Sequence, residues 1–284
     1  MTENSPEHDA SSSANATSKD EPHEREDDAG TTEEKDHALD RVILEGRPRL
    51  HRGTADLLAT GAVAGIEVAI GVLALLAVEA ATGSRLLGAL AFSIGLIALR
   101  LGHSELFTEG FHVPVMVVLA EEATWWQLVR LWVGTLVGNL VGGFVLAWLI
   151  AVALPDLHET ADTMAREFTE APLDLQTFTL AVLAGAAITL LTRMQGGTDD
   201  DLAKLVAAVG IALVIVGGGL FHSILDSLII FVGMHAGSPA AAWDAWLPWF
   251  GFVVLGNLVG GLVLTTLLRV VRSRERLEQW RRAG

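Results

Sequence analysis

The chain has 284 residues, of which 51% are hydrophobic, and its formal net charge at pH 7 is −15. So large a hydrophobic fraction is unusual for a soluble protein. The absence of cysteine excludes a disulfide framework and thiolate chemistry.

Residues 1–45 are predicted to form a disordered acidic tail. Residues 1–40 contain 13 of the 34 acidic residues but only 3 of the 19 lysines and arginines, and no aromatic residue. Such a segment cannot bury enough apolar surface to offset the entropy lost on ordering. It also lacks the charged-then-apolar start of a signal peptide. The tail either binds a regulatory partner or only keeps the molecule solvated.

Residues 46–272 are predicted to form an all-α integral membrane domain, because a bilayer core needs about 20 apolar residues per helix. The six apolar stretches are 55–81, 86–120, 127–154, 178–194, 202–235 and 243–271. Two of them are broken by polar residues, the second by GHSELFTEGFH (102–112) and the fifth by FHSILDS (221–227). Non-helical backbone at membrane depth is tolerated only where it faces protein or water. Both breaks are therefore expected to line a pathway.

The basic residues predict the orientation of the spans. Four arginines precede the first span between 41 and 52, and six follow the sixth between 269 and 282, whereas the third loop (155–174) is acidic. This distribution fits six spans with both termini in the cytoplasm. Residues 273–284 would then be a basic cytoplasmic tail.

Two short sequences occur twice at nearly the same offset. GNLVGG occurs at 138–143 and 256–261, and HS occurs at 103–104 and 222–223. A duplication with three spans in each half makes the halves opposite in orientation. This 3+3 inverted repeat, with broken helices in equivalent places, is the plan of many transporters. The glycines in these motifs are expected to allow close helix packing.

Four segments together resemble the formate/nitrite transporter family: SELFTEG (104–110), RLWVGTLVGNLVGG (130–143), FHS (221–223) and GNLVGG (256–261). The resemblance covers roughly residues 50–271. It implies an aquaporin-like inverted repeat of six helices, and a homopentamer with one pore per protomer. It further implies passage of small monovalent anions such as formate, nitrite or hydrosulfide, often with a proton. We therefore expect a channel or transporter rather than an enzyme, in the plasma membrane of a prokaryote, with no cofactor and no nucleic-acid partner.

The resemblance also assigns candidate pore residues. The family's Leu-Phe-Thr motif matches Leu106, Phe107 and Thr108, and its central histidine matches His222, followed by Ser223. The threonine is expected to bond to the substrate or to the histidine, which lies between apolar constrictions. In a purely structural alternative, Thr108 bonds a freed backbone carbonyl, and a neighbour satisfies the neutral histidine.

The chain departs from the best-known family pattern in three places. It has Glu109 after Leu-Phe-Thr, Asp226 four residues after the histidine, and no lysine just before the fourth span. It is closer to a branch with an LFTE motif and a long hydrophilic N-terminus. If Glu109 and Asp226 are ionised and unpaired, the pore would favour a neutral or cationic solute.

Further roles are open for the polar residues of the first break. Glu109 either lines the vestibule or caps the half-helix at 113–120. Glu105 is counted among the pore residues, although it is also suited to satisfy backbone groups at the break. Arg100 is a possible partner of Glu105 or Glu109. Asp226 is the neighbour considered for a purely structural His222.

Enzyme and scaffold functions fit the sequence less well than transport does. His103, Glu105, Glu109 and His112 are zinc-type ligands, but the His-Glu-x-x-His motif of a metalloprotease is absent. A serine protease would need a Gly-x-Ser-type site, which GHS and FHS do not provide. A membrane scaffold would explain the acidic tail but not the duplicated pore elements. No metal site is therefore expected.

Overall fold

The computed structural model describes residues 39–272 and 274–283. Within these residues every regular element is a helix, and no strand is present. This confirms the predicted all-α class. After a first helix over residues 39–51, the elements are α2 (Thr54–Thr82), α3 (Arg85–Gly102), η1 (Phe107–Phe111), α4 (Val113–Leu119), α5 (Trp125–Ala153), η2 (Pro155–Leu157), α6 (His158–Thr169), α7 (Leu175–Gly196), α8 (Asp201–Ala212), η3 (Leu213–Gly217), α9 (Ser223–His235), α10 (Trp243–Val259), η4 (Gly260–Leu267), α11 (Leu268–Arg272) and α12 (Arg274–Ala283).

In the described part of the chain, five helices are long and apolar enough to cross a bilayer, namely Thr54–Thr82, Arg85–Gly102, Trp125–Ala153, Leu175–Gly196 and Trp243–Leu264. They correspond to the predicted spans one to four and six. Lipid cannot satisfy backbone N–H and C=O groups, so stretches of this kind must be helical. The predicted fifth span is divided among α8, η3 and α9. A total of six spans therefore stays a prediction.

The second predicted span is interrupted where its sequence turns polar. α3 ends at Gly102, and His103 takes a left-handed conformation with a φ of 53° that turns the chain out of the helix. Residues 104–106 are not helical, and the chain continues through η1 and α4. The interruption predicted in this region is confirmed, although its second half forms a 3-10 helix.

The second break starts before the place that the sequence predicts. The prediction is an interruption at 221–227, but Ser223 already begins α9, and the chain leaves η3 at Gly218. Gly219 makes the turn with a φ of 62°, which glycine adopts without strain. The interruption of the fifth span is confirmed, but its placement was wrong, because the polar side chains of His222 and Asp226 bond to the first turn of α9 rather than interrupting it.

The duplicated GNLVGG motifs occupy equivalent places. The first lies in α5, which packs against α2, and the second runs from α10 into η4, which both pack against α7. A Cβ atom on Gly65 would lie 2.1 Å from the carbonyl oxygen of Asn139, and one on Gly185 would lie 2.1 Å from that of Asn257. Both helix pairs thus approach each other closely at matched positions. The opposite orientation of the two halves stays a prediction.

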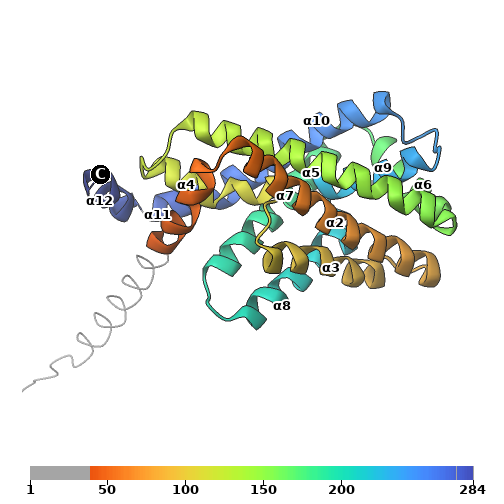
Figure 1. Ribbon diagram of the computed structural model, residues 1–284, viewed down its shortest axis with the longest axis horizontal. Coiled ribbons are helices and arrows are strands. Elements are labelled where there is room, and N and C mark those ends of the chain that lie inside the picture. Colours follow the sequence, from red (N-terminus) through yellow and green to blue (C-terminus); the bar gives the residue numbers. More distant parts are fainter. Residues whose placement is uncertain (1–38, 273, 284) are drawn as a thin grey trace, which may run out of the picture.

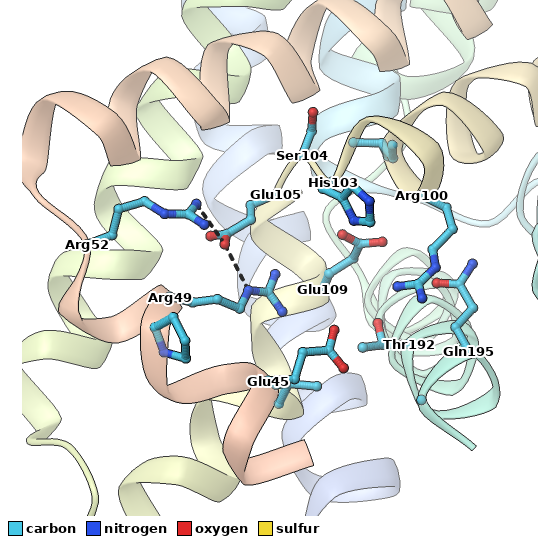
Figure 2. A pocket seen from close by; sticks show the side chains of 14 residues that line it. Glu45, Arg49, Arg52, Arg100, His103, Ser104, Glu105, Glu109, Thr192 and Gln195 are labelled. Carbon is cyan, nitrogen blue, oxygen red and sulfur yellow. Dashed lines mark hydrogen bonds and ion pairs between the residues drawn. The ribbon is translucent and has the colours of Figure 1, made fainter. Parts of the chain in front are cut away.

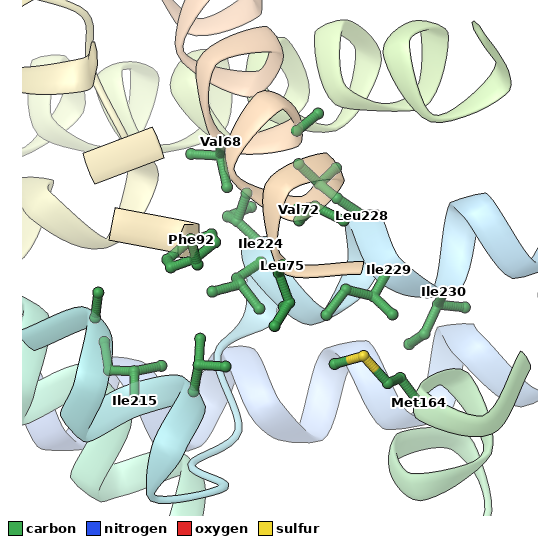
Figure 3. Close-up of a cluster of buried hydrophobic side chains, with 14 of the residues drawn as sticks. Val68, Val72, Leu75, Phe92, Met164, Ile215, Ile224, Leu228, Ile229 and Ile230 are labelled. Carbon is green, nitrogen blue, oxygen red and sulfur yellow. The ribbon is translucent and has the colours of Figure 1, made fainter. Parts of the chain in front are cut away.

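The short helix α9 lies at the centre of the hydrophobic core. All of its residues from Ser223 to Gly233 are buried. In the largest apolar cluster, Ile224 and Leu228 of α9 gather with Val72 of α2 and Phe92 of α3 (Figure 3). Burial on every side fixes the position of α9, and with it the position of His222 at its first turn.

The two ends of the described chain lie together at one end of the molecule (Figure 1). Leu39 and Ile43 of the first helix are buried in a cluster with Leu277 of α12, and Arg276 Nε donates to Asp40 Oδ1 over 3.0 Å. The predicted boundary of the disordered tail at residue 45 was therefore too far along the chain, because residues 39–45 already belong to a packed helix. The acidic residues dominate the average composition of the segment and hide the apolar spacing of Leu39, Val42 and Ile43. The rest of that tail, residues 1–38, lies outside the described residues.

The acidic third loop contains α6, a helix that the sequence analysis did not predict. Ala161, Met164, Ala165 and Phe168 are its buried residues. This spacing of three and four residues is typical of an amphipathic helix. α6 packs against α9 and lies at the end of the molecule opposite the termini (Figure 1).

Candidate functional site

A buried asparagine in α5 holds the first break. Asn139 Nδ2 donates to the carbonyl oxygens of Gly61 at 2.9 Å and Glu105 at 3.0 Å. Its Oδ1 accepts a hydrogen bond from the N–H of Phe107 at 2.8 Å. Interrupting a helix leaves backbone groups without partners, and buried groups of this kind require one. Asn139 therefore stabilises the non-helical segment between α3 and η1.

A second asparagine makes the same three contacts at the second break. Asn257 Nδ2 donates to the carbonyl oxygens of Ala181 at 2.8 Å and Phe221 at 2.9 Å, and its Oδ1 accepts from Ser223 N–H at 2.9 Å. The sequence analysis assigned no role to either asparagine. The available signal was their shared place in the duplicated GNLVGG motif.

The two breaks bring Thr108 and His222 together. Thr108 Oγ1 lies 2.9 Å from His222 Nε2. Both residues are almost fully buried, with exposed fractions of 0% and 2%. Thr108 comes from η1 and His222 precedes α9, so residues 114 positions apart meet at the junction of the two interrupted spans. Of the two alternatives for Thr108, the structure shows the bond to the histidine.

The hydrogen bonds of His222 define its tautomer. The backbone N–H of Leu225 donates to His222 Nδ1 over 3.1 Å, so Nδ1 is an acceptor and carries no proton. The neutral ring must then carry its proton on Nε2 and donate it to Thr108 Oγ1. The threonine hydroxyl is left with its own proton for another acceptor.

Asp226 supports this arrangement from the first turn of α9, whereas the side chain of Ser223 does not. Asp226 Oδ2 accepts a hydrogen bond from the backbone N–H of His222 at 2.7 Å, so it fixes the main chain and does not bond to the imidazole ring. Ser223 Oγ is buried and makes no hydrogen bond to any residue that the structure describes. Ser223 therefore adds an unused polar atom directly after His222.

The residues that flank Thr108 and His222 in the chain are buried and apolar. Leu106 and Phe107 are both buried, and the ring of Phe107 meets that of Phe111 edge-on with centroids 5.0 Å apart. At the second break, the ring of Phe221 lies against the rings of Phe168 and Trp249. A charged solute near Thr108 would therefore have lost most of its water.

A pocket of about 220 Å³ lies between the first helix, the break after α3, and α7. We call it the vestibule. Its lining includes three arginines, three glutamates and one histidine: Arg49, Arg52, Arg100, Glu45, Glu105, Glu109 and His103 (Figure 2). The predicted pore residues Glu105 and Glu109 thus belong to the vestibule rather than to the central pair.

Two arginines of the N-terminal region neutralise Glu105. Glu105 Oε1 accepts from Arg49 Nε and from Arg52 Nη1, both at 2.9 Å. Burial lowers the pKa of Arg49, but the Glu105 carboxylate and further acidic neighbours raise it above its usual value. The suggested pair between Arg100 and Glu105 is not formed. The sequence analysis had used Arg49 and Arg52 only to orient the spans.

Glu109 is half-buried and points into the vestibule (Figure 2). Its Oε2 accepts a long hydrogen bond of 3.4 Å from Leu106 N–H at the start of η1. Arg49 and Arg100 are the cations that act on it electrostatically. Glu109 thus lines the vestibule and also caps η1, whereas the alternative of a cap on α4 was wrong.

The four zinc-type ligands of the first break do not converge. Glu105 is occupied by arginines, and His112 Nδ1 lies 3.4 Å from Thr266 Oγ1. Among residues 39–272 and 274–283, no three histidine or acidic side chains are grouped so that they could hold a metal ion.

Comparisons with known proteins agree with this geometry. The family model described as formate/nitrite transporter matches residues 36–271. The inner membrane protein YfdC of Escherichia coli is 24% identical over 86% of this chain and 80% of its own length. The uncharacterized transporter YrhG of Bacillus subtilis is also 24% identical, over 86% of this chain and 97% of its own length. A probable formate transporter of Methanothermobacter thermautotrophicus is 28% identical over 62% of this chain and 71% of its own length.

Two solved structures share the fold. An ion channel of the FNT family has a TM-score of 0.77 at 20% sequence identity, covering 83% of this chain and 98% of its own. A pentameric formate channel with formate bound has a TM-score of 0.66 at 22% identity, and the match covers 78% of this chain and 98% of the channel's chain.

Proposed function

Because the chain belongs to the formate/nitrite transporter family, we propose that it carries a small monovalent weak-acid anion across a membrane together with a proton. The observation that supports this most directly is the buried pair of Thr108 and His222, where the two interrupted spans meet. The names of two similar proteins, the probable formate transporter and the pentameric formate channel, favour formate as the type of substrate.

Thr108 would orient the anion. An anion that passes Leu106 and Phe107 exchanges water for an apolar surface, which is costly for a charge unless new hydrogen bonds form. The Thr108 hydroxyl supplies such a bond, because its oxygen accepts from His222 Nε2–H and its proton is available to the anion. Ser223 Oγ, which is buried in the same region, is a second candidate donor.

His222 would pass the proton. A proton that reaches Nδ1 displaces the bond from Leu225 N–H and gives an imidazolium ring. The ring then releases its Nε2 proton to Thr108 Oγ1, and the threonine releases its own proton to the anion. The anion becomes the neutral acid, and the ring is neutral again. An imidazolium in this apolar place is stable only beside an anion, so the proton and the anion are coupled.

A neutral or cationic solute is the alternative raised by the extra carboxylates. The carboxylates concerned are Glu109 and Asp226. Asp226 accepts the backbone N–H of His222, and Glu109 faces the cations Arg49 and Arg100 in the vestibule. Each of the two carboxylates therefore has a positively polarised group beside it. These contacts support an anion rather than a cation.

The same proposal includes topology and assembly. Six spans with both termini in the cytoplasm of a prokaryotic cell, at its plasma membrane, would place the vestibule on the cytoplasmic side, since Arg47 and Arg49 of the first helix and Arg52 just after it precede the first span. The exposed apolar side chains of the long helices are suited to lipid and to neighbouring protomers. We propose a homopentamer with one pathway in each protomer. Native mass measurement in mild detergent should give five protomers, and a stable monomer would contradict it.

Uptake into liposomes tests the transport proposal. Purified protein should take up formate, nitrite and acetate, but not methylammonium, and an inward proton gradient should increase the rate. His222→Asn keeps a hydrogen-bonding side chain but does not titrate near neutral pH, so the gradient should lose its effect. Uptake of methylammonium in place of the acids would refute the proposal. A proton-gradient effect that persists in His222→Asn would show that the proton takes another route.

A further inference from the structure

The vestibule contains a cation that the central pair does not use. Arg100 lies at the end of α3 and is half-buried. With the residues that the structure describes, it forms no hydrogen bond and no ion pair within 4 Å. Arg49 and Arg52, by contrast, share Glu105 Oε1. Arg100 is therefore the arginine of the vestibule that lacks a direct anionic partner.

Glu109 is the carboxylate that faces this arginine. With residues 39–272 and 274–283, its only hydrogen bond is the long contact to Leu106 N–H, and both Arg49 and Arg100 act on it electrostatically. Figure 2 shows its carboxylate between the two guanidinium groups. Glu109 thus occupies the position that a small external carboxylate would take.

One acceptor near the vestibule lacks a partner. Glu105 is 3% exposed, and its Oε2 has no hydrogen-bond partner among the described residues although Oε1 has two. A buried acceptor of this kind requires a donor such as water, so it does not attract an anion, and an anion in the vestibule depends on Arg100 and Glu109. The lining residues of α7, Thr192 and Gln195, carry no charge, so the walls on that side do not compete for Arg100.

We propose that the vestibule is a second anion site, which takes one small carboxylate such as formate, with Arg100 as counter-ion and Glu109 as a tethered competitor. Ionised Glu109 attracts the guanidinium groups of Arg49 and Arg100, so they are not available to a second anion. Protonated Glu109 is neutral, leaves Arg100 available, and can donate a hydrogen bond to the bound anion. The site would load the central pair, so this inference rests on the proposed function.

Other charged groups face Glu109 and enter the test. The first helix contributes Glu45, Arg49 and, at its end, Arg52; the break contributes Glu105, which is already paired. α3 contributes Arg100 and, at its end, the exposed His103. A His103 variant is therefore the control for a second ionisable side chain in the same vestibule.

Formate binding to the purified full-length protein, followed by proton saturation-transfer NMR at about pH 7.5 and about pH 5.5, tests the site. Wild-type protein should bind formate more tightly at the lower pH, and so should His103→Gln. Glu109→Gln should bind about tenfold more tightly at the higher pH and lose the pH dependence, whereas Arg100→Gln should bind about tenfold more weakly at both. Glu159→Gln and Arg193→Gln make the same charge changes outside the vestibule and should match wild type.

Three results would overturn this site. They are unchanged affinity in Arg100→Gln, a pH dependence that survives Glu109→Gln, and loss of the pH dependence in His103→Gln. If His222→Asn abolishes binding while Arg100→Gln does not, formate binds only at the central pair, and the proposed function is unaffected. If binding follows the predicted pattern but liposomes take up no formate, the vestibule site stands and the proposed function fails. Unchanged thermal unfolding of each variant shows that it is folded, and Arg100→Lys provides a milder variant if Arg100→Gln is not.

Discussion

Asn139→Ala should destabilise the protein by about 2–5 kcal/mol, because it removes all three hydrogen bonds at the first break. The N–H of Phe107 and the carbonyl of Glu105 would each lose a buried partner, at about 1–3 kcal/mol per group. The carbonyl of Gly61 lies inside α2 and keeps its helical bond, so its loss costs less. Equilibrium unfolding in mixed detergent micelles measures the change.

Asn257→Ala should cost a similar amount, since its three bonds repeat those of Asn139. Thr135→Val is the matched control, because the Thr135 hydroxyl is buried in the same helix but bonds only to carbonyls of its own helix. The control should cost no more than about 1 kcal/mol. If Asn139→Ala were as mild as Thr135→Val, the asparagine would not hold the break. If the two asparagine variants differed by several kcal/mol, the two breaks would not be equivalent.

Three further predictions concern the central pair, helix packing and the chain ends. Thr108→Val should lower formate uptake about tenfold or more, and Thr108→Ser should retain most of it, because only the serine keeps the hydroxyl; equal rates in the two variants would argue against the hydroxyl. Gly185→Ala should prevent the close approach of α7 and α10 and lower the yield of folded protein, whereas Gly210→Ala, with open space at its Cβ, should behave as wild type in the same expression and size-exclusion assay. Asp40→Ala removes the acceptor for Trp280 Nε1–H and for Arg276, so trypsin should cleave within α12 faster than in wild type; an unchanged cleavage rate would mean that apolar contacts alone hold α12.

The central pair could be predicted because its parts are local in sequence. The Leu-Phe-Thr motif and the Phe-His-Ser motif each stand inside an apolar stretch, where a polar side chain is costly to bury and therefore conspicuous. The family resemblance paired them across 114 residues, and the structure shows the bond between Thr108 and His222. The second break could not be placed as well, because a polar run looks the same whether it interrupts a helix or caps one. Gly218 and Gly219, rather than the polar residues, mark that break.

The amino-acid sequence by itself determined the membrane class and the duplicated landmarks, because the length of apolar runs and the repetition of motifs are properties of the chain alone. The tertiary structure decided which charged and polar side chains pair with one another. The sequence offered Arg100 as a possible partner of Glu105, whereas the fold pairs Glu105 with Arg49 and Arg52, which are more than 50 residues away. The same holds for Asn139 and Asn257, whose partners come from separate helices. Pairing between distant side chains depends on how helices pack, and no local pattern encodes it.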